Sequence, residues 1–267
     1  MHWYDFGARW QDPAAGRWWS VDALAEERCW VNPYSYVQNN PISRVDSYGA
    51  LDSPIFDKDG NFLGVDSEGY SGDIVVMRTE SYNALTNNGQ GTLDHSLTEK
   101  LVGTGNSFFA ANLNDAGISI EAYSNILTHV TEQLNGESFD GATLDFSRLE
   151  GGKIQIANEV VDEEGYVVRE LHGTATNPAS QHAGTLRRDN GDINVTVVLR
   201  YGKNEDFGTV ENVQNIIGIH EYYGHGVKGL SAKSASEHRK VYRLQTQHST
   251  YKKVSPSVID LIKAGLE

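Results

Sequence analysis

Cysteine is almost absent from this chain of 267 residues, which contains only Cys29. A single cysteine cannot form an internal disulfide framework, and it excludes a metal site built from several thiolates. Long apolar runs are missing as well, since no segment approaches the roughly 18 residues that a membrane-spanning helix needs. We therefore expect no membrane span and no cysteine-based scaffold.

Basic residues are also scarce, with 22 Lys and Arg against 36 Asp and Glu and a formal net charge of −14. Nucleic-acid phosphates are bound by basic surfaces, so this balance argues against nucleic acid as a partner. The N-terminus lacks the charged and then apolar pattern of a signal peptide. The length is sufficient for one large or two modest domains with a sizeable buried core.

The side chains with the clearest chemical potential follow an apolar segment near the C-terminal end. His220, Glu221 and His225 come directly after Ile216-Ile217-Gly218-Ile219. Imidazoles are common zinc ligands, and a carboxylate beside them can take a proton from an attacking water. Buried imidazoles and carboxylates need partners, and one metal ion satisfies all three groups. The pattern predicts a buried metal-binding helix that begins near Thr209.

The spacing of the two histidines is unusual for a helix. Residues five apart on an α-helix point about 140° apart, so a regular helix could not direct both imidazoles at one ion. A wide turn with i→i+5 hydrogen bonds would bring them to one face, and such turns occur frequently at functional sites. Gly224, directly before His225, would ease this distortion.

A third ligand is expected on the next helix, which begins near Ser234 or Ser236. Glu237 and His238 are adjacent there. We favour His238, since histidine is the commonest metal ligand, but two histidines and a glutamate would be equally good chemistry. An active site would also need a group that stabilises the oxyanion, for which the sequence offers three side chains without choosing among them: Tyr242, His248 and Tyr223.

The hexapeptide from His220 to His225 resembles the H-E-x-x-G-H motif of the dipeptidyl peptidase III family of zinc peptidases. His220, Glu221, Gly224 and His225 match the motif. The resemblance implies a Zn²⁺ site with Glu221 as general base, and it argues for a shared site and not a shared fold. In that family the third ligand is a glutamate in an acidic run, and no such run follows here.

The N-terminal end carries a second pattern, rich in aromatic residues and tight turns, with all five tryptophans in the first 30 residues. Residues 3–20 and 32–42 resemble the RHS-repeat-associated core of bacterial polymorphic toxins, through Tyr-Asp-x-Gly-x-Arg-like and Asp-Pro-x-x-Gly-Arg-Trp elements. The resemblance implies an upstream RHS shell, delivery by a specialised bacterial secretion system and an immunity protein as partner. Autocleavage after the core would use Asp22 and Asp46, but Ser47 stands where the family has proline.

The remaining pattern predicts an α+β protein in three parts: a small β segment of the RHS-core type (1–49), a turn-rich connector (50–72) and a zincin-like toxin domain (73–267). That domain should hold a twisted antiparallel sheet and metal-bearing helices, because its order of a helix, a sheet and then the His-Glu helix resembles that of zincin-type peptidases. The expected strands are 73–78, 153–161, 166–174 and 192–201, the middle two forming a hairpin. Helices are expected at 121–134 and from about Pro256. We expect Asp192–Tyr201 to bind substrate backbone by edge pairing.

These patterns favour a zinc-dependent peptidase that acts on a protein or peptide substrate as the effector domain of an RHS-type toxin. Two alternatives remain open. One is a metal hydrolase that acts on a non-peptide substrate, and the other is a binding module in which zinc only joins two helices. A structural site of the latter kind closes its fourth position with a protein ligand and has no use for a carboxylate such as Glu221.

Overall fold

A computed structural model describes residues 53–67, 70–86, 93–105, 110–178 and 182–267, together with the backbone of three short N-terminal strands. These strands, β1 (Tyr4–Asp5), β2 (Trp10–Asp12) and β3 (Arg17–Trp18), pair in sequence order as an antiparallel meander. Short strands joined by turns are what the sequence predicts for this segment. Asp22 and Asp46 lie outside the described residues.

A small sheet follows, with strand order β5-β4-β6-β7. Two of its strands, β4 (Pro54–Phe56) and β5 (Phe62–Val65), come from the stretch expected to be a connector. The others are β6 (Val75–Met77), at the predicted strand 73–78, and β7 (Ala110–Asn112). Two helices accompany this sheet, α1 (Thr79–Leu85) and α2 (His95–Gly103), and a small apolar cluster lies beneath them.

The main sheet has the strand order β11-β10-β13-β12. Its strands are β10 (Gln155–Val161), β11 (Val167–His172), β12 (Ala183–Arg187) and β13 (Ile193–Arg200). The predicted hairpin is confirmed, because β10 and β11 pair antiparallel from Val161↔Val167 to Ile156↔His172. The β12–β13 pair is antiparallel too, whereas the central pair β10–β13 is parallel.

The strand expected to bind substrate at an edge lies inside the sheet. β13 is flanked by β10 and β12, and its residues from Ile193 to Leu199 are all buried. After β11 the chain forms β12, which pairs with the side of β13 that does not contact β10. Strand β12 is therefore an edge strand of the main sheet. Strand β12 was not predicted, because Ala183–Arg187 contains Gly184 and lacks a clear apolar alternation.

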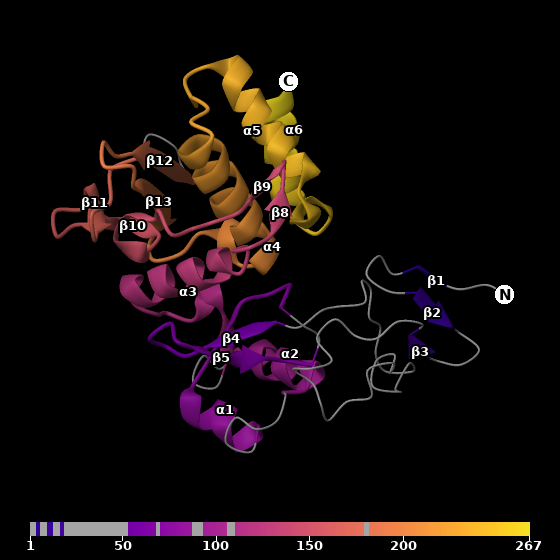
Figure 1. The fold of residues 1–267 in the computed structure, drawn as a ribbon. Helices are drawn as coiled ribbons and strands as arrows, with labels where there is room; N and C mark the ends of the chain where they lie inside the picture. The colour runs from indigo at the N-terminus through magenta and orange to yellow at the C-terminus, as the bar shows by residue number, and fades with distance from the viewer. Residues whose placement is uncertain are drawn as a thin grey trace.

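The helices that complete the C-terminal part lie on one side of this sheet (Figure 1). They are α3 (Ile120–Glu132), α4 (Val210–Val213), the π-helix η5 (Gln214–Val227), α5 (Ala235–Gln247) and α6 (Pro256–Leu266). The short elements are η2 (Leu113–Asp115), β8 (Ser138–Phe139), β9 (Ala142–Thr143), η3 (Glu150–Gly152), η4 (Glu205–Phe207) and η6 (Ser249–Lys252). Helix η5 contacts β12 and β13 on one side and α5 on the other.

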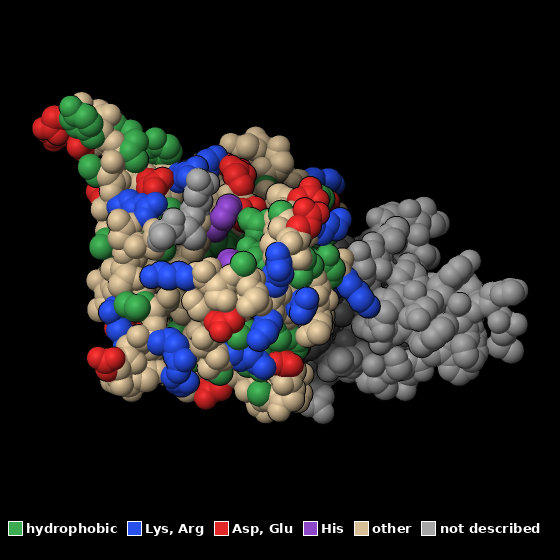
Figure 2. Space-filling view, turned by 90° about the horizontal axis from the view of Figure 1, so that it is seen from above, with side chains coloured by type: hydrophobic (Ala, Val, Ile, Leu, Met, Phe, Trp, Pro, Cys, Tyr) green, Lys and Arg blue, Asp and Glu red, His purple; other side chains and the backbone are tan. Residues whose placement is uncertain are grey.

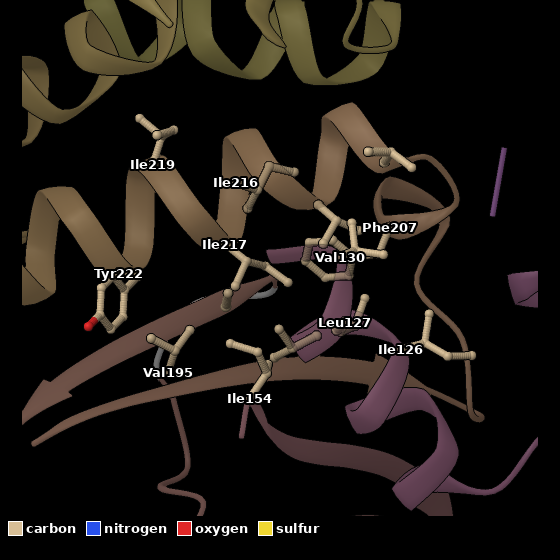
Figure 3. Packing of buried hydrophobic residues seen from close by; sticks show 14 of the residues in the cluster. Ile126, Leu127, Val130, Ile154, Val195, Phe207, Ile216, Ile217, Ile219 and Tyr222 are labelled. Carbon is tan, nitrogen blue, oxygen red and sulfur yellow. The ribbon is translucent and has the colours of Figure 1, made fainter. Parts of the chain in front are cut away.

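The core fills the space between the main sheet, α3 and η5 (Figure 3). Leu127 and Val130 of α3, Val195 of β13 and Ile217 of η5 are fully buried there. Burial of one such side chain contributes about 1.5 to 3 kcal/mol, so this contact holds η5 firmly against the sheet. The α+β class is confirmed. None of the helices in the described part of the chain combines the length and apolarity needed to cross a bilayer.

Candidate metal centre

The histidine-bearing helix owes its position to apolar residues on most of its circumference. Thr209 caps its N-terminus by accepting a hydrogen bond from the backbone N–H of Asn212. From Gln214 the hydrogen bonding is of the π type and continues to Val227, which confirms the predicted i→i+5 geometry and extends it well beyond one turn. Residues five apart therefore share a face, and His220 and His225 point the same way.

Three imidazoles converge at the contact between η5 and α5. His220 Nε2 lies 3.2 Å from His225 Nε2 and 3.0 Å from His238 Nε2. One ligand atom from each of the three residues lies within 4.8 Å of the other two, so the cluster could hold a metal ion. Figure 2 shows histidine side chains inside a hollow of the surface with Lys and Arg side chains nearby.

The protons on two of these rings are fixed by their outer hydrogen bonds. His225 Nδ1 lies 2.6 Å from the backbone oxygen of Leu230, which can only accept, so Nδ1 carries the proton. His220 Nδ1 lies 2.7 Å from Gln245 Oε1 and donates to it in the same way. At neutral charge both Nε2 atoms therefore present lone pairs to each other across 3.2 Å. No proton is present to join them, and a cation between them resolves the repulsion.

The orientation of the Gln245 amide is itself determined by a buried network. Asn215 Nδ2 donates to the backbone oxygen of Gln245 at 3.2 Å and to Thr250 Oγ1 at 2.9 Å. Its Oδ1 consequently faces Gln245 Nε2, 2.8 Å away, which leaves Gln245 Oε1 to face His220. Asn215 and Gln245 are almost completely buried. Such outer partners hold a metal-binding histidine in one tautomer and one orientation.

The network continues to His248, one of the side chains considered for oxyanion stabilisation. His248 Nδ1 lies 2.9 Å from Thr250 Oγ1, and its Nε2 lies 3.1 Å from Glu137 Oε1. His248 therefore does not belong to the three-histidine cluster. Burial lowers the pKa of this imidazole, although the Glu137 carboxylate opposes the shift.

Burial also keeps two of the clustered imidazoles neutral. It lowers the pKa of His220 to about 3, with the charge of His225 acting in the same direction. The pKa of His238 falls to about 4, again chiefly through burial and then through His220 and His225. Only a neutral imidazole can donate a lone pair to a metal, so both rings are ready to bind one at neutral pH.

Glu221 is buried next to this cluster and has a neutral hydrogen-bond donor of its own. The Thr185 hydroxyl of β12 donates to Glu221 Oε2 over 2.6 Å. Burial raises the pKa of Glu221, while Thr185 and then the histidines His225 and His238 act to lower it. A divalent cation at the histidines would favour the ionised carboxylate further.

The structure distinguishes between Glu237 and His238, the two adjacent candidates for the third ligand. His238 joins the cluster, whereas Glu237 Oε2 accepts a hydrogen bond from the backbone N–H of Ser231 at 2.8 Å and lies outside it. Tyr242, one turn after His238, places its ring 4.9 Å from the ring of His220 and 4.7 Å from that of His238. Tyr223 instead directs its hydroxyl to Asp140, 3.4 Å away.

Two residues of this centre were missed by the sequence analysis, Thr185 and Gln245. Gln245 could have been found, because it lies seven residues after His238 on the same helix and so shares its face. Thr185 had no such indication, since its strand was not predicted and the contact with Glu221 spans 36 residues.

Comparisons with protein-family models, with curated proteins and with solved structures give no significant match to this chain. The resemblances to the dipeptidyl peptidase III motif and to the RHS core therefore remain predictions from the sequence. Any functional assignment depends on the geometry of the centre itself.

Proposed function

We propose that this protein is a zinc-dependent hydrolase that cleaves peptide bonds. The observation that carries the proposal is the convergence of three imidazoles beside one buried carboxylate. Zn²⁺ is the metal that fits best, because imidazole nitrogens suit it and three histidines with a fourth, open position are a recurrent catalytic arrangement. Among the residues that the structure describes, no fourth His, Cys, Asp or Glu joins the cluster.

The missing fourth protein ligand separates this proposal from the zinc-joined binding module. A structural zinc site is closed by four protein ligands, whereas a catalytic one keeps a position for water or substrate. His248 does not close the site, since it is not part of the cluster and its ring nitrogens lie 2.9 Å from Thr250 Oγ1 and 3.1 Å from Glu137 Oε1. The bound metal would supply Lewis acidity toward water and the substrate carbonyl.

Glu221 is the proposed general base. Its place directly after a ligand on a π-helix holds the carboxylate close to the three imidazoles. The Thr185 hydroxyl occupies Oε2, so Oε1 is left to take the proton from the attacking water and to return it to the leaving amine. Tyr242 is the candidate for oxyanion support, because among the three candidates its ring alone lies against the ligands.

The outer edge of β12 at Thr185 supports a peptide as substrate. Arg188 N–H donates to Asp192 O and Val198 N–H to His182 O, both over 2.8 Å, which sets the alternation of the antiparallel pair. Thr185 and Arg187 fall between these bonded positions, so their backbone N–H and C=O groups face away from β13. An extended peptide can pair with these groups, and Thr185 places that edge beside Glu221.

The biological setting that we propose follows from the N-terminal resemblance. Residues 1–49 would be the end of an RHS shell, and the hydrolase would be the effector delivered by a specialised secretion system. An immunity protein would then protect the producing cell. Asp22 and Asp46 are the residues proposed for release by autocleavage.

Proteolysis by the zinc-loaded protein tests the enzymatic proposal. We expect an unfolded protein such as casein to acquire new termini, detected by mass spectrometry, and Glu221→Gln to slow their appearance by about 10²- to 10⁴-fold while zinc content stays at the wild-type level. Glu237→Gln is the matched control and should cleave like the wild type. Equal cleavage by the wild type and Glu221→Gln would remove Glu221 from the mechanism.

A further inference from the structure

The β10–β11 hairpin presents an unusual concentration of exposed apolar side chains. Tyr166 is 71% exposed, Val167 63% and Leu171 50%, and Val161 and Val168 are exposed as well. Strand β11 is the outer edge of the main sheet, opposite the edge beside the metal centre. Figure 2 shows apolar and acidic side chains together on the projection at the upper left, where this hairpin lies. Long apolar edge strands are normally protected because they pair readily with other strands.

The backbone of β11 has a defined set of unpaired groups. Asp162 N–H donates to Tyr166 O over 2.9 Å at the turn, which makes this pair a hydrogen-bonded one. Alternation along the antiparallel ladder then directs the N–H and C=O groups of Val167, Arg169 and Leu171 away from β10. Three donors and three acceptors therefore line the outer edge.

We propose that β11 pairs antiparallel with β11 of a second copy of this chain, in a register centred on Arg169. The apolar pairs on one face of the strand match in this register, since Val167 of one copy lies opposite Leu171 of the other. On the other face Tyr166 lies opposite His172, and Val168 lies opposite Glu170. Apolar cross-strand pairs stabilise a sheet by about 0.2 to 1 kcal/mol each, in addition to the hydrogen bonds between the two edges. The result is one continuous sheet of eight strands, with a β12 strand at each end.

The charges on the hairpin are compatible with this register. The two copies of Arg169 face each other, but each donates from Nε and Nη2 to Glu159 Oε1 at 2.9 and 2.8 Å, so its charge is compensated within its own copy. The acidic turn of residues 162–164 falls at opposite ends of the paired strands. At 3.4 Å per residue the two turns are about 20 to 30 Å apart, two to three times the Debye length of about 8 Å at physiological salt.

Sedimentation velocity over a range of protein concentrations, from about 5 to about 500 µM, tests the pairing, since a one-strand interface is small and should dissociate reversibly. We expect a monomer–dimer equilibrium for the wild type. Leu171→Lys and Val167→Asp should each be monomeric, because each puts a charge into both of the apolar pairs formed by positions 167 and 171. Tyr201→Lys, which alters an exposed aromatic residue outside the hairpin, is the control and should dimerise like the wild type.

Mixing the two monomeric variants tests the register itself. In the proposed register the lysine ammonium at position 171 of one copy faces the carboxylate at position 167 of the other, so the mixture should recover a dimer. A wild type that stays monomeric throughout the range, or a dimer that Leu171→Lys does not weaken, would overturn the proposal. So would a mixture of Leu171→Lys and Val167→Asp that remains monomeric. The measurement does not depend on zinc or on hydrolysis.

Discussion

At the scale of single residues, the metal centre depends on which ring nitrogen of each histidine carries the proton. The Gln245 amide fixes this for His220, and Asn215 fixes the amide. We expect Gln245→Leu to weaken zinc binding by about 10- to 100-fold, the loss usual for an outer-shell partner of a metal ligand. Competition with a chromophoric chelator measures the affinity.

Gln214→Leu is the matched control for that substitution. Gln214 is also a buried glutamine, but its amide donates to the backbone oxygen of Val130 and not to a ligand. Both variants lose a buried hydrogen bond and should lose similar thermal stability, whereas only Gln245→Leu should lose zinc affinity. Equal affinities in the two variants would show that the amide does not position His220.

The choice of the third ligand is a second question at this scale. His238→Ala should lower zinc affinity by more than the roughly 100-fold expected from an outer-shell change, because it removes one of three converging nitrogens. Glu237→Ala removes only the contact with the Ser231 backbone and should bind zinc nearly as well as the wild type. Isothermal titration with Zn²⁺ distinguishes them, and the reverse ranking would reassign the ligand.

Local sequence rules found the clustered histidines but not the residues that support them. His220, Glu221 and His225 are close in sequence, so spacing alone could indicate both the metal and the π geometry. Thr185 and Gln245 act through the tertiary fold, where a strand edge and a second helix meet η5. Contacts between segments so far apart in the chain produce no periodic pattern in the sequence.

At the scale of elements, the glycines of η5 permit close packing on three sides. A Cβ at Gly224 would lie 2.6 Å from Val241 Cγ1 of α5, and one at Gly218 would lie 2.7 Å from Leu134 Cδ1. At Gly226 the nearest atom would be Ile193 Cγ2, also at 2.7 Å. Gly224 therefore does more than ease the π turn, because it sets the distance between the helices that carry the three histidines.

Gly224→Ala should consequently destabilise the protein by about 1 to 3 kcal/mol, the usual cost of overpacking, and should weaken zinc binding by separating η5 from α5. Gly103→Ala in α2 is the control, because a Cβ there meets nothing within 4 Å. Urea denaturation measures the free energies of unfolding. Equal stability of Gly224→Ala and the wild type would contradict the close-packing explanation.

Periodicity placed most elements of the C-terminal part correctly, including α3, the β10–β11 hairpin, β13 and η5. It could not show the order of strands in the sheet, because that order depends on where the chain returns after β11. Asp192–Tyr201 was therefore taken for an edge strand although β12 covers it. The edge that we propose for the substrate is therefore β12 and not β13.

At the scale of the whole molecule, the buried imidazoles couple metal-free stability to pH. The pKa of histidine is ordinarily about 6.5, and burial lowers that of His220 to about 3 and that of His238 to about 4. Below pH 6.5 the unfolded chain therefore binds protons that the folded chain excludes. The free energy of unfolding should decrease as the pH falls from about 6.5 to about 4.

The slope of the free energy of unfolding against pH is measured by urea denaturation with a chelator present, at several values of pH between about 4 and about 6.5. Replacing one buried imidazole by a group that does not titrate, as in His238→Gln, should make the slope shallower. An unchanged slope in this variant would mean that other groups govern the acid sensitivity.

The central claim is that three histidine nitrogens, and no fourth protein ligand, bind one zinc ion. X-ray absorption at the zinc edge, on protein loaded with one equivalent of Zn²⁺, tests it most directly. We expect about one tightly bound zinc per chain, with three imidazole nitrogens at about 2.0 to 2.1 Å and a fourth scatterer that is an oxygen from solvent. A protein that binds no zinc, or a spectrum with four imidazole ligands, would contradict it.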